Sequence, residues 1–262
     1  MLSRLRSSCV PSAAVEPFKN VLFVVPAVVL FSIFYIYPFF ELFHLSLHQW
    51  QGIGPKMFVG LQNFRDLAVD KVWWSSIGHA GYITLIALTF QNALAFALAL
   101  ACDREIRMKR FYSIVFFIPP VLSEVVVGIL WNWILNAGVH QGQQVGIFNH
   151  ALTQIGLPHL VHNWLSDPKS ALTCIALVHS WKGFGWGFVL LLAGLQTIDR
   201  QLYEVAKVDG AGAWRTFWNV TLPMMVPVIL VVVILTILGS MQVFVLILSL
   251  VRQGLVYHTE VP

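Results

Sequence analysis

The chain has 262 residues, of which 58% are hydrophobic and 11% are charged, and its formal net charge at pH 7 is +4. Soluble domains carry roughly 25% charged residues, so this composition excludes an ordinary soluble protein and indicates one that lipid solvates. The cysteines Cys9, Cys102 and Cys174 stand far apart and are odd in number, which supports neither a disulfide framework nor a zinc site.

Five apolar segments are long enough to cross a bilayer, which takes about 20 mostly apolar residues in a helix. They cover about residues 21–47, 77–102, 111–135, 171–195 and 224–251. The first is too long for the apolar part of a signal peptide, so we expect it to remain as an anchor. Pro119 and Pro120 interrupt the third. The segments predict an all-α membrane protein with a single transmembrane domain over residues 1–262.

The lysines and arginines predict the orientation, because the cytoplasmic loops of membrane proteins are enriched in both. With the N-terminus in the cytoplasm, ten of them lie in inner segments, five lie in outer segments and Lys182 lies within a span. The inner ten are Arg4, Arg6, Lys19, Arg104, Arg107, Lys109, Arg110, Arg200, Lys207 and Arg215. Residues 196–223 then form a cytoplasmic loop, and residues 48–76 and 136–170 face outward.

The chain carries no recognisable catalytic or nucleotide-binding pattern. It has no glycine-rich loop that ends in Lys-Ser or Lys-Thr, and no nucleophile with an evident base. His140, His150, His159 and His162 lie in an outer segment, but their irregular spacing without a carboxylate or an i, i+4 pair does not predict a metal site. We therefore expect no enzyme, no metal and no cofactor in this chain.

The segment between the fourth and fifth spans is polar and predicts two short helical pieces hinged at Gly210. A glycine after Asp209 suits the left-handed conformation that ends many helices. Beyond it, Trp214, Phe217 and Trp218 fall on one helix face, and Pro223 begins the next span. The residues alone leave two interpretations open: a helix that rests in the lipid headgroups, or a surface that holds a partner in the water phase.

The same segment resembles the EAA loop of ABC importer permeases, which starts with Glu-Ala-Ala, continues to a glycine and closes with Leu-Pro. Val205 replaces the first alanine of that pattern. The matching positions are Glu204, Ala206, Asp209, Gly210, Ala211, Leu222 and Pro223. The Asp-Gly-Ala run and the aromatic Phe217 are similar to the sugar-permease branch, which includes the maltose- and glycerol-phosphate-type permeases.

Other segments resemble the same family in the same order along the chain. Residues 58–64 are similar to the stretch after its first helix, and residues 146–149 are similar to a short outer-loop motif. Residues 164–168 resemble the approach to the next span, and residues 193–198 lead into the EAA-type loop.

The resemblance implies the fold of a type I ABC importer transmembrane domain in a bacterial cytoplasmic (inner) membrane. The loop would be the coupling helix, with Glu204 as the polar anchor towards the ATPase and Gly210 as the turn between its two arms. The implied partners are a second permease subunit, a cytoplasmic ATPase dimer that uses the ATP, and an extracytoplasmic solute-binding protein. The implied solute is a sugar or a sugar-like molecule, and we expect no nucleic-acid partner.

Glu124 and Lys182 are charged residues within predicted spans, where charges are rare and functional. Glu124, Trp131 and Asn132 share a helix face and are candidates for lining a sugar path. The alternative is that Glu124 makes a polar contact between helices while the tryptophans sit at the membrane interface, and the position of Trp131 near the end of its span favours it. We expect Lys182 to reach outward to the interface rather than to bind solute.

The C-terminal segment differs from the family pattern. Permeases of this type have six spans, and this chain stops at Pro262, where the sixth would begin. We therefore expect a truncated sixth span. Two other functions stay open at this point: an ion-coupled secondary transporter, for which the sequence shows no convincing inverted repeat, and a membrane scaffold that transports nothing.

Overall fold

The structure is a computed structural model that describes residues 17–103, 109–140, 143–144 and 146–251. The chain forms two compact units, residues 1–70 and residues 71–262.

The first unit is one long helix followed by a short hairpin. The helix is continuous through α1 (Pro17–Phe31), a π-helical turn η1 (Ser32–Ile36) and α2 (Tyr37–Ser46). Strands β1 (His48–Gln49) and β2 (Met57–Phe58) pair antiparallel, and α3 (Gln62–Val69) follows. The Asn63 amide donates to the carbonyls of Ser46 and His48 at 2.8 and 3.1 Å, which caps the end of α2.

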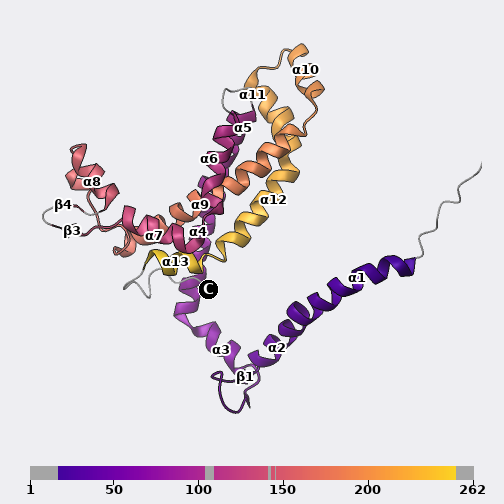
Figure 1. The fold of residues 1–262 in the computed structure, drawn as a ribbon, viewed down its shortest axis with the longest axis vertical. Helices are drawn as coiled ribbons and strands as arrows, with labels where there is room; N and C mark the ends of the chain where they lie inside the picture. Colours follow the sequence, from indigo (N-terminus) through magenta and orange to yellow (C-terminus); the bar gives the residue numbers. More distant parts are fainter. Residues whose placement is uncertain (1–16, 104–108, 141–142, 145, 252–262) are drawn as a thin grey trace, which may run out of the picture. The chain divides into compact units, whose positions relative to one another are not determined.

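The second unit is a helix bundle with two short strands (Figure 1). Its helices are α4 (Lys71–Ile86), η2 (Ala87–Gln91), α5 (Asn92–Asp103), α6 (Lys109–Val121), α7 (Glu124–Ile134), α8 (Ile147–Gln154), η3 (Pro158–Leu160), α9 (Pro168–Gln196), α10 (Arg200–Val208), α11 (Ala213–Thr216), η4 (Phe217–Thr221), α12 (Leu222–Ser240) and α13 (Phe244–Leu250). Strands β3 (Val139–His140) and β4 (Gln143–Gln144) pair antiparallel.

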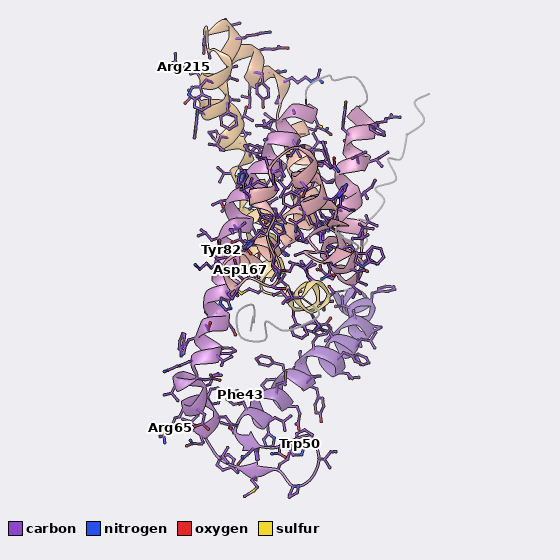
Figure 2. All side chains as sticks on the ribbon, turned by 90° about the vertical axis from the view of Figure 1, so that its left-hand side faces the viewer. Phe43, Trp50, Arg65, Tyr82, Asp167 and Arg215 are labelled. Carbon is purple, nitrogen blue, oxygen red and sulfur yellow. The ribbon has the colours of Figure 1, made fainter. Side chains whose placement is uncertain are left out.

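The α9 helix is the centre of this bundle and packs against α4, α5, α6, α12 and α13. One buried cluster surrounds Phe188, with Ala95 from α5 and Met225 from α12. A second surrounds Ile175, with Val127 from α7 and Leu246 from α13. Figure 1 shows α10 and α11 at one end of the bundle, and α7, α8 and α13 at the other. Figure 2 shows the same separation, with Arg215 at the first end and Asp167 toward the second.

Four helices of the described residues are long and apolar enough to cross a membrane: Phe23–Ser46, Lys71–Asp103, Pro168–Gln196 and Ala213–Ser240. The third predicted span differs from a straight helix, since it consists of Arg110–Val121 and Glu124–Ile134, bent by 99°. The bend follows the two prolines and lies at Leu122 and Ser123. The Ser123 hydroxyl accepts a bond from the Val126 N–H at 3.3 Å and starts α7 as a new helix.

The fifth predicted span, 224–251, also differs from the observed helix. Its helix ends at Ser240, and residues 244–250 form the separate helix α13, which packs against α7. At its other end this helix starts early, because it is continuous from Ala213 through η4 into α12. Pro223 therefore lies inside a continuous helix and does not begin it, contrary to the sequence-based expectation.

A π-helical turn explains how this helix accommodates Pro223. A proline has no N–H, and its ring clashes with the carbonyl four residues earlier in a regular α-helix. In η4 the Leu222 N–H donates instead to the Phe217 carbonyl, five residues back, which widens the turn just before the proline. The same arrangement precedes Pro38 in the first unit, where the Tyr37 N–H donates to the Ser32 carbonyl.

Candidate functional site

A cavity with both polar and apolar lining lies between η2, α7, α9 and α12, and its apolar part includes Trp186, Leu190, Val232 and Leu235. Its volume is about 530 Å³. Polar or charged side chains from four separate segments line it, namely Gln91, Glu124, His179, Lys182, Thr236 and Gln242. Groups of this kind are expensive to place within apolar membrane helices and are found there mainly where they face water, a partner or a substrate.

An ion pair forms one wall of this cavity. Lys182 Nζ lies 2.7 Å from Glu124 Oε1, and the two side chains are 16% and 35% exposed. Glu124 is the first residue of α7, where the helix dipole also favours a negative charge. The structure therefore differs from the prediction for Lys182, because this lysine contacts Glu124 across the bundle and does not reach outward. The polar contact between helices that was one of the two interpretations for Glu124 is present.

Two of the described side chains that line the cavity also carry buried oxygens without partners. Among the described residues, Glu124 Oε2 and Gln91 Oε1 are buried and have no hydrogen-bond partner. Unpaired buried acceptors are unfavourable unless something supplies a donor. Both oxygens are enclosed by protein atoms, so a side-chain movement would have to precede any contact with a solute in the cavity.

Hydrogen bonds between amide and hydroxyl groups form the opposite side of the cavity. Gln91 Nε2 donates to Thr236 Oγ1 at 3.5 Å, and the Thr236 hydroxyl lies 3.0 Å from Asn92 Oδ1. A Cβ atom at Gly183 would come within 2.8 Å of Gln91 Cδ, so the glycine makes room for this side chain. Sequence reasoning missed Gln91, His179 and Thr236. The polar Gln91-Asn92 pair in the middle of an apolar span was the signal that could have found the first of them.

The three residues proposed for a sugar path do not meet at one cavity. Glu124 lines the central cavity, whereas Asn132 lines a second cavity of about 370 Å³ and donates to the Leu250 carbonyl at 2.7 Å. The Trp131 ring packs edge-on against Trp181, with 5.4 Å between the ring centroids. The three share α7, but they contact different surroundings.

The loop at 196–223 begins with a well-capped helix. The Asp199 carboxylate accepts the Gln201 N–H at 2.9 Å and caps the start of α10. At the other end the Ala211 N–H donates to the Ala206 carbonyl at 2.9 Å, and the Gly210 N–H donates to the Lys207 carbonyl at 3.1 Å. This bond pattern is a Schellman motif.

Gly210 has the left-handed conformation that the motif requires, with φ of +73°, so the structure confirms the expected role of this glycine in the turn. Asp209 is the last residue before it, at the C-cap of α10.

The second arm of the loop is an extension of the α12 helix. Trp214, Phe217 and Trp218 pack on one another, with ring centroids 5.5 to 6.2 Å apart, as their spacing predicted. Phe217 turns towards the bundle and lies 5.9 Å from the Phe96 ring of α5. Trp214 is 74% exposed, and Val208 at the end of α10 is 88% exposed. The loop thus presents large apolar side chains on its outer surface.

A third cavity, of about 510 Å³, lies between this loop and the end of the bundle. Glu204, Lys207 and Ala211 line it from the loop side, and Leu100 and Leu195 line it from the bundle. Glu204 borders this cavity and is exposed, as is Val205 beside it. Leu222 and Pro223 lie further along the α12 helix.

Within the described residues, no group of three or more His, Cys, Asp or Glu side chains could hold a metal ion. Of the outer histidines, one contacts a carboxylate and another is exposed. His162 Nε2 lies 2.7 Å from Asp167 Oδ2, and the Asp167 carboxylate also accepts the Lys169 N–H at 3.1 Å. The Lys169 N–H and the His162 ring hold the pKa of the Asp167 carboxyl below its ordinary value of 3.8. His150 lies in α8 and is exposed.

Comparison with known proteins gives a consistent result. Residues 93–259 match the sequence profile of the family described as binding-protein-dependent transport system inner membrane component. The probable ABC transporter permease protein YurN of Bacillus subtilis is 33% identical over 226 residues, which are 85% of this chain and 75% of that protein.

A second relative and a solved structure agree. The lactose transport system permease protein LacF of Rhizobium radiobacter is 32% identical over 224 residues, 85% of this chain and 72% of that protein. The fold is similar to a chain in the crystal structure of a bacterial alginate ABC transporter in complex with an alginate pentasaccharide-bound periplasmic protein. The TM-score is 0.75 and the identity 24%, over 92% of this chain and 79% of that chain.

Proposed function

We propose that this chain moves a sugar or sugar-like solute with energy from a separate ATPase. It belongs to the family of binding-protein-dependent transport system inner membrane components, in the sugar-permease branch. It is a multi-pass inner-membrane permease subunit of an ABC importer and not an enzyme, with the fold of a type I importer transmembrane domain. Family membership also removes ion-coupled transport and scaffolding as leading alternatives.

The central cavity carries the proposal for the solute. Its volume of about 530 Å³ falls in the range of about 300–1,000 Å³ typical of small-molecule sites. Polar side chains at Gln91, Glu124 and Lys182 line it beside apolar ones such as Trp186 and Leu190. A sugar presents hydroxyl groups that both donate and accept, so it suits this mixture better than an apolar solute or a bare ion.

The loop at 196–223 carries the proposal for coupling. Its outer surface exposes apolar side chains at Val205, Val208 and Trp214, which a protein partner in the water phase would cover. The turn at Gly210 connects α10 to the helix that continues into α12, and α12 lines the central cavity. In this proposal Glu204, Ala206, Asp209, Gly210, Ala211, Leu222 and Pro223 form the coupling segment, and ATP is used by the partner ATPase.

The first unit supports a second permease subunit as a partner. Its span, Phe23–Ser46, is long and apolar enough to cross a membrane. A helix with apolar side chains on all sides needs lipid or another membrane helix around it. An extracytoplasmic solute-binding protein is a further partner that we propose. In this proposal the N-terminus lies in the cytoplasm, and residues 48–76 and 136–170 face outward.

A reconstitution experiment tests this function. The chain is co-expressed with its second permease and ATPase, purified through a tag on the chain, and placed in proteoliposomes with the binding protein. We expect ATP-dependent uptake from a panel of labelled sugars, and loss of ATPase capture when Glu204→Ala is introduced. Glu41→Gln, which changes an exposed carboxylate in the first unit that pairs with Lys56, is the matched control and should retain capture.

Two results would contradict the proposal. Uptake that proceeds equally well without ATP would remove the ATP-driven mechanism. Capture of the ATPase that is the same for wild type, Glu204→Ala and Glu41→Gln would remove Glu204 from the coupling surface.

A further inference from the structure

A hydrogen bond joins the two arms of the loop. The Tyr203 hydroxyl of α10 lies 3.2 Å from the Thr221 hydroxyl, which is the last residue of η4. Thr221 is only 6% exposed. The Tyr203 ring packs against the buried cluster that includes Leu195 and Met225. The bond therefore connects a helix on the surface to a buried point on the α12 helix.

The buried end of this bond lies at a weak place in the helix. In η4 the regular α-helical bonds are replaced by the wider π pattern, and Pro223 follows two residues after Thr221. Position 223 supplies no N–H to the preceding turn, so the backbone bends more readily here than in the continuous helix on either side.

The α10 helix itself has room to move. The cavity of about 510 Å³ lies between it and the bundle, lined by Glu204, Lys207 and Thr216. The side chains of α10 therefore make few contacts with the bundle over this stretch. Tyr203 accounts for a larger share of the contacts that remain. On the second arm, Phe217 holds the helix to α5 through its contact with Phe96.

We infer that Tyr203 is a positioning residue for coupling: its bond to Thr221 transmits the movement of α10 to the π turn and so to α12. The consequence reaches the solute site because Thr236, which lines the central cavity, follows Thr221 by fifteen positions on the same helix. At 1.5 Å per residue this corresponds to about 22 Å of helix. The inference rests on the coupling function proposed above for residues 196–223.

The test removes single hydroxyl groups in the complete transporter. Tyr203→Phe and Thr221→Val each delete one partner without changing the bulk of the side chain, and Thr221→Ser keeps the hydroxyl. The readout is the number of solute molecules taken up per ATP hydrolysed in proteoliposomes. We expect each deletion to lower this ratio about three- to tenfold, the range for loss of one hydrogen bond. The double variant should be no worse than either single one, and Thr221→Ser should retain the wild-type ratio.

A matched pair elsewhere in the bundle serves as the control. The Tyr82 hydroxyl of α4 lies 3.0 Å from the Thr173 hydroxyl of α9, the same chemistry at a position remote from the loop. Figure 2 labels Tyr82 well away from Arg215, which marks the loop end. Tyr82→Phe and Thr173→Val should leave the ratio of uptake to hydrolysis unchanged.

The outcomes separate this inference from the function on which it rests. An unchanged ratio in Tyr203→Phe and Thr221→Val, with normal ATP-driven uptake by the wild type, would overturn the inference alone. Loss of ATPase capture by Tyr203→Phe would also overturn it, because Tyr203 would then act in docking. A wild-type transporter without ATP-driven uptake would overturn the proposed function and the inference with it.

Discussion

The central cavity and the loop at 196–223 depart in opposite ways from the usual placement of side chains in a membrane protein. The cavity has charged groups inside the bundle, and the loop has large apolar groups on its surface. The cavity places Glu124 and Lys182 among apolar helices, where charges are unfavourable. The loop places Val208 and Trp214 on an exposed surface between polar residues. Departures of this kind tend to mark functional positions, because they persist only where a ligand or partner compensates for them.

The two regions also differ in how they are built. The cavity combines η2, α7, α9 and α12, so its side chains come from residues 91–242. The loop is organised by neighbours in sequence, through the Asp199 cap and the Schellman bonds around Gly210. A change in the cavity should therefore affect long-range packing and solute binding, whereas a change in the loop should affect coupling and leave the bundle folded.

The largest expected effect is at the ion pair. Lys182→Met leaves the Glu124 carboxylate without its partner, so we expect a loss of stability of roughly 2 kcal/mol, less than the roughly 3–5 kcal/mol for a fully buried pair because Glu124 is partly exposed. Uptake should fall at least about tenfold. Thermal unfolding in detergent and sugar uptake in proteoliposomes measure the two effects.

The double variant Lys182→Met with Glu124→Gln is the control for this prediction. It removes both charges, so stability should return towards that of the wild type while uptake stays low. If Lys182→Met alone were as stable as the wild type, the ion pair would not hold α7 against α9.

The next effect is at the turn of the loop. Gly210→Val places a β-branched residue at φ +73°, where a side chain is unfavourable by roughly 1–2 kcal/mol. We expect the Schellman turn to be lost and ATP hydrolysis to be uncoupled from uptake, while the protein still inserts in the membrane. Hydrolysis and uptake measured on the same proteoliposomes test this.

A second glycine in the same loop provides the comparison. Gly212 has an ordinary φ of −69°, and a Cβ there would meet nothing within 4 Å. Gly212→Ala should therefore retain coupling. Normal ATP-driven uptake by Gly210→Val would contradict the role of the turn.

A smaller effect is expected at a glycine that is needed for space and not for its backbone angles. A Cβ at Gly183 would lie 2.8 Å from Gln91 Cδ, so Gly183→Ala should displace the Gln91 amide from the central cavity. The displaced group is the end of a flexible side chain, so stability should fall by roughly 1 kcal/mol, the lower end of the cost of overpacking. The solute concentration that gives half-maximal uptake should rise several-fold, whereas the maximum ATPase rate should not change.

A matched glycine on a neighbouring helix tests whether the effect belongs to the cavity. Gly81 in α4 has nothing within 4 Å of a built Cβ, so Gly81→Ala should leave uptake unaltered. Equal shifts in half-saturation for Gly81→Ala and Gly183→Ala would count against Gln91 as a solute contact.

The smallest effect concerns pH at the start of α9. The pKa of the Asp167 carboxyl is lowered from 3.8, first by the Lys169 N–H and then by the His162 ring. A lowered folded-state pKa means that this carboxylate stabilises the fold fully above about pH 3.8, and that the contribution is lost as the pH falls through the lower folded value. The stability difference between wild type and Asp167→Ala should accordingly be present at pH 6 and shrink below about pH 3.8.

Unfolding temperatures of the two proteins between pH 6 and pH 3 measure this difference. Asp199→Ala removes the corresponding cap from α10 and should weaken coupling more than it lowers the unfolding temperature. A stability difference for Asp167→Ala that grew as the pH fell would reverse the sign of the argument.

Part of the fold and of the candidate site was predictable because local patterns determine it. The apolar segments, the break after Pro119 and Pro120 and the turn at Gly210 follow from hydropathy and backbone preferences of a few neighbouring residues. The bounds of the last helix were not predictable in this way. Pro223 usually marks a helix start, and only the π turn at 217–221 lets the helix pass through it.

By itself, the sequence determined that this protein is an all-α membrane protein with a capped polar loop, since these properties depend on residues close together in the chain. Only the tertiary structure decided that Lys182 faces Glu124, that Gln91 and Thr236 share their cavity, and that Asn132 belongs to another. The physical reason is that helix packing and the 99° bend after α6 bring these side chains together, and no spacing along one helix encodes which helix becomes its neighbour.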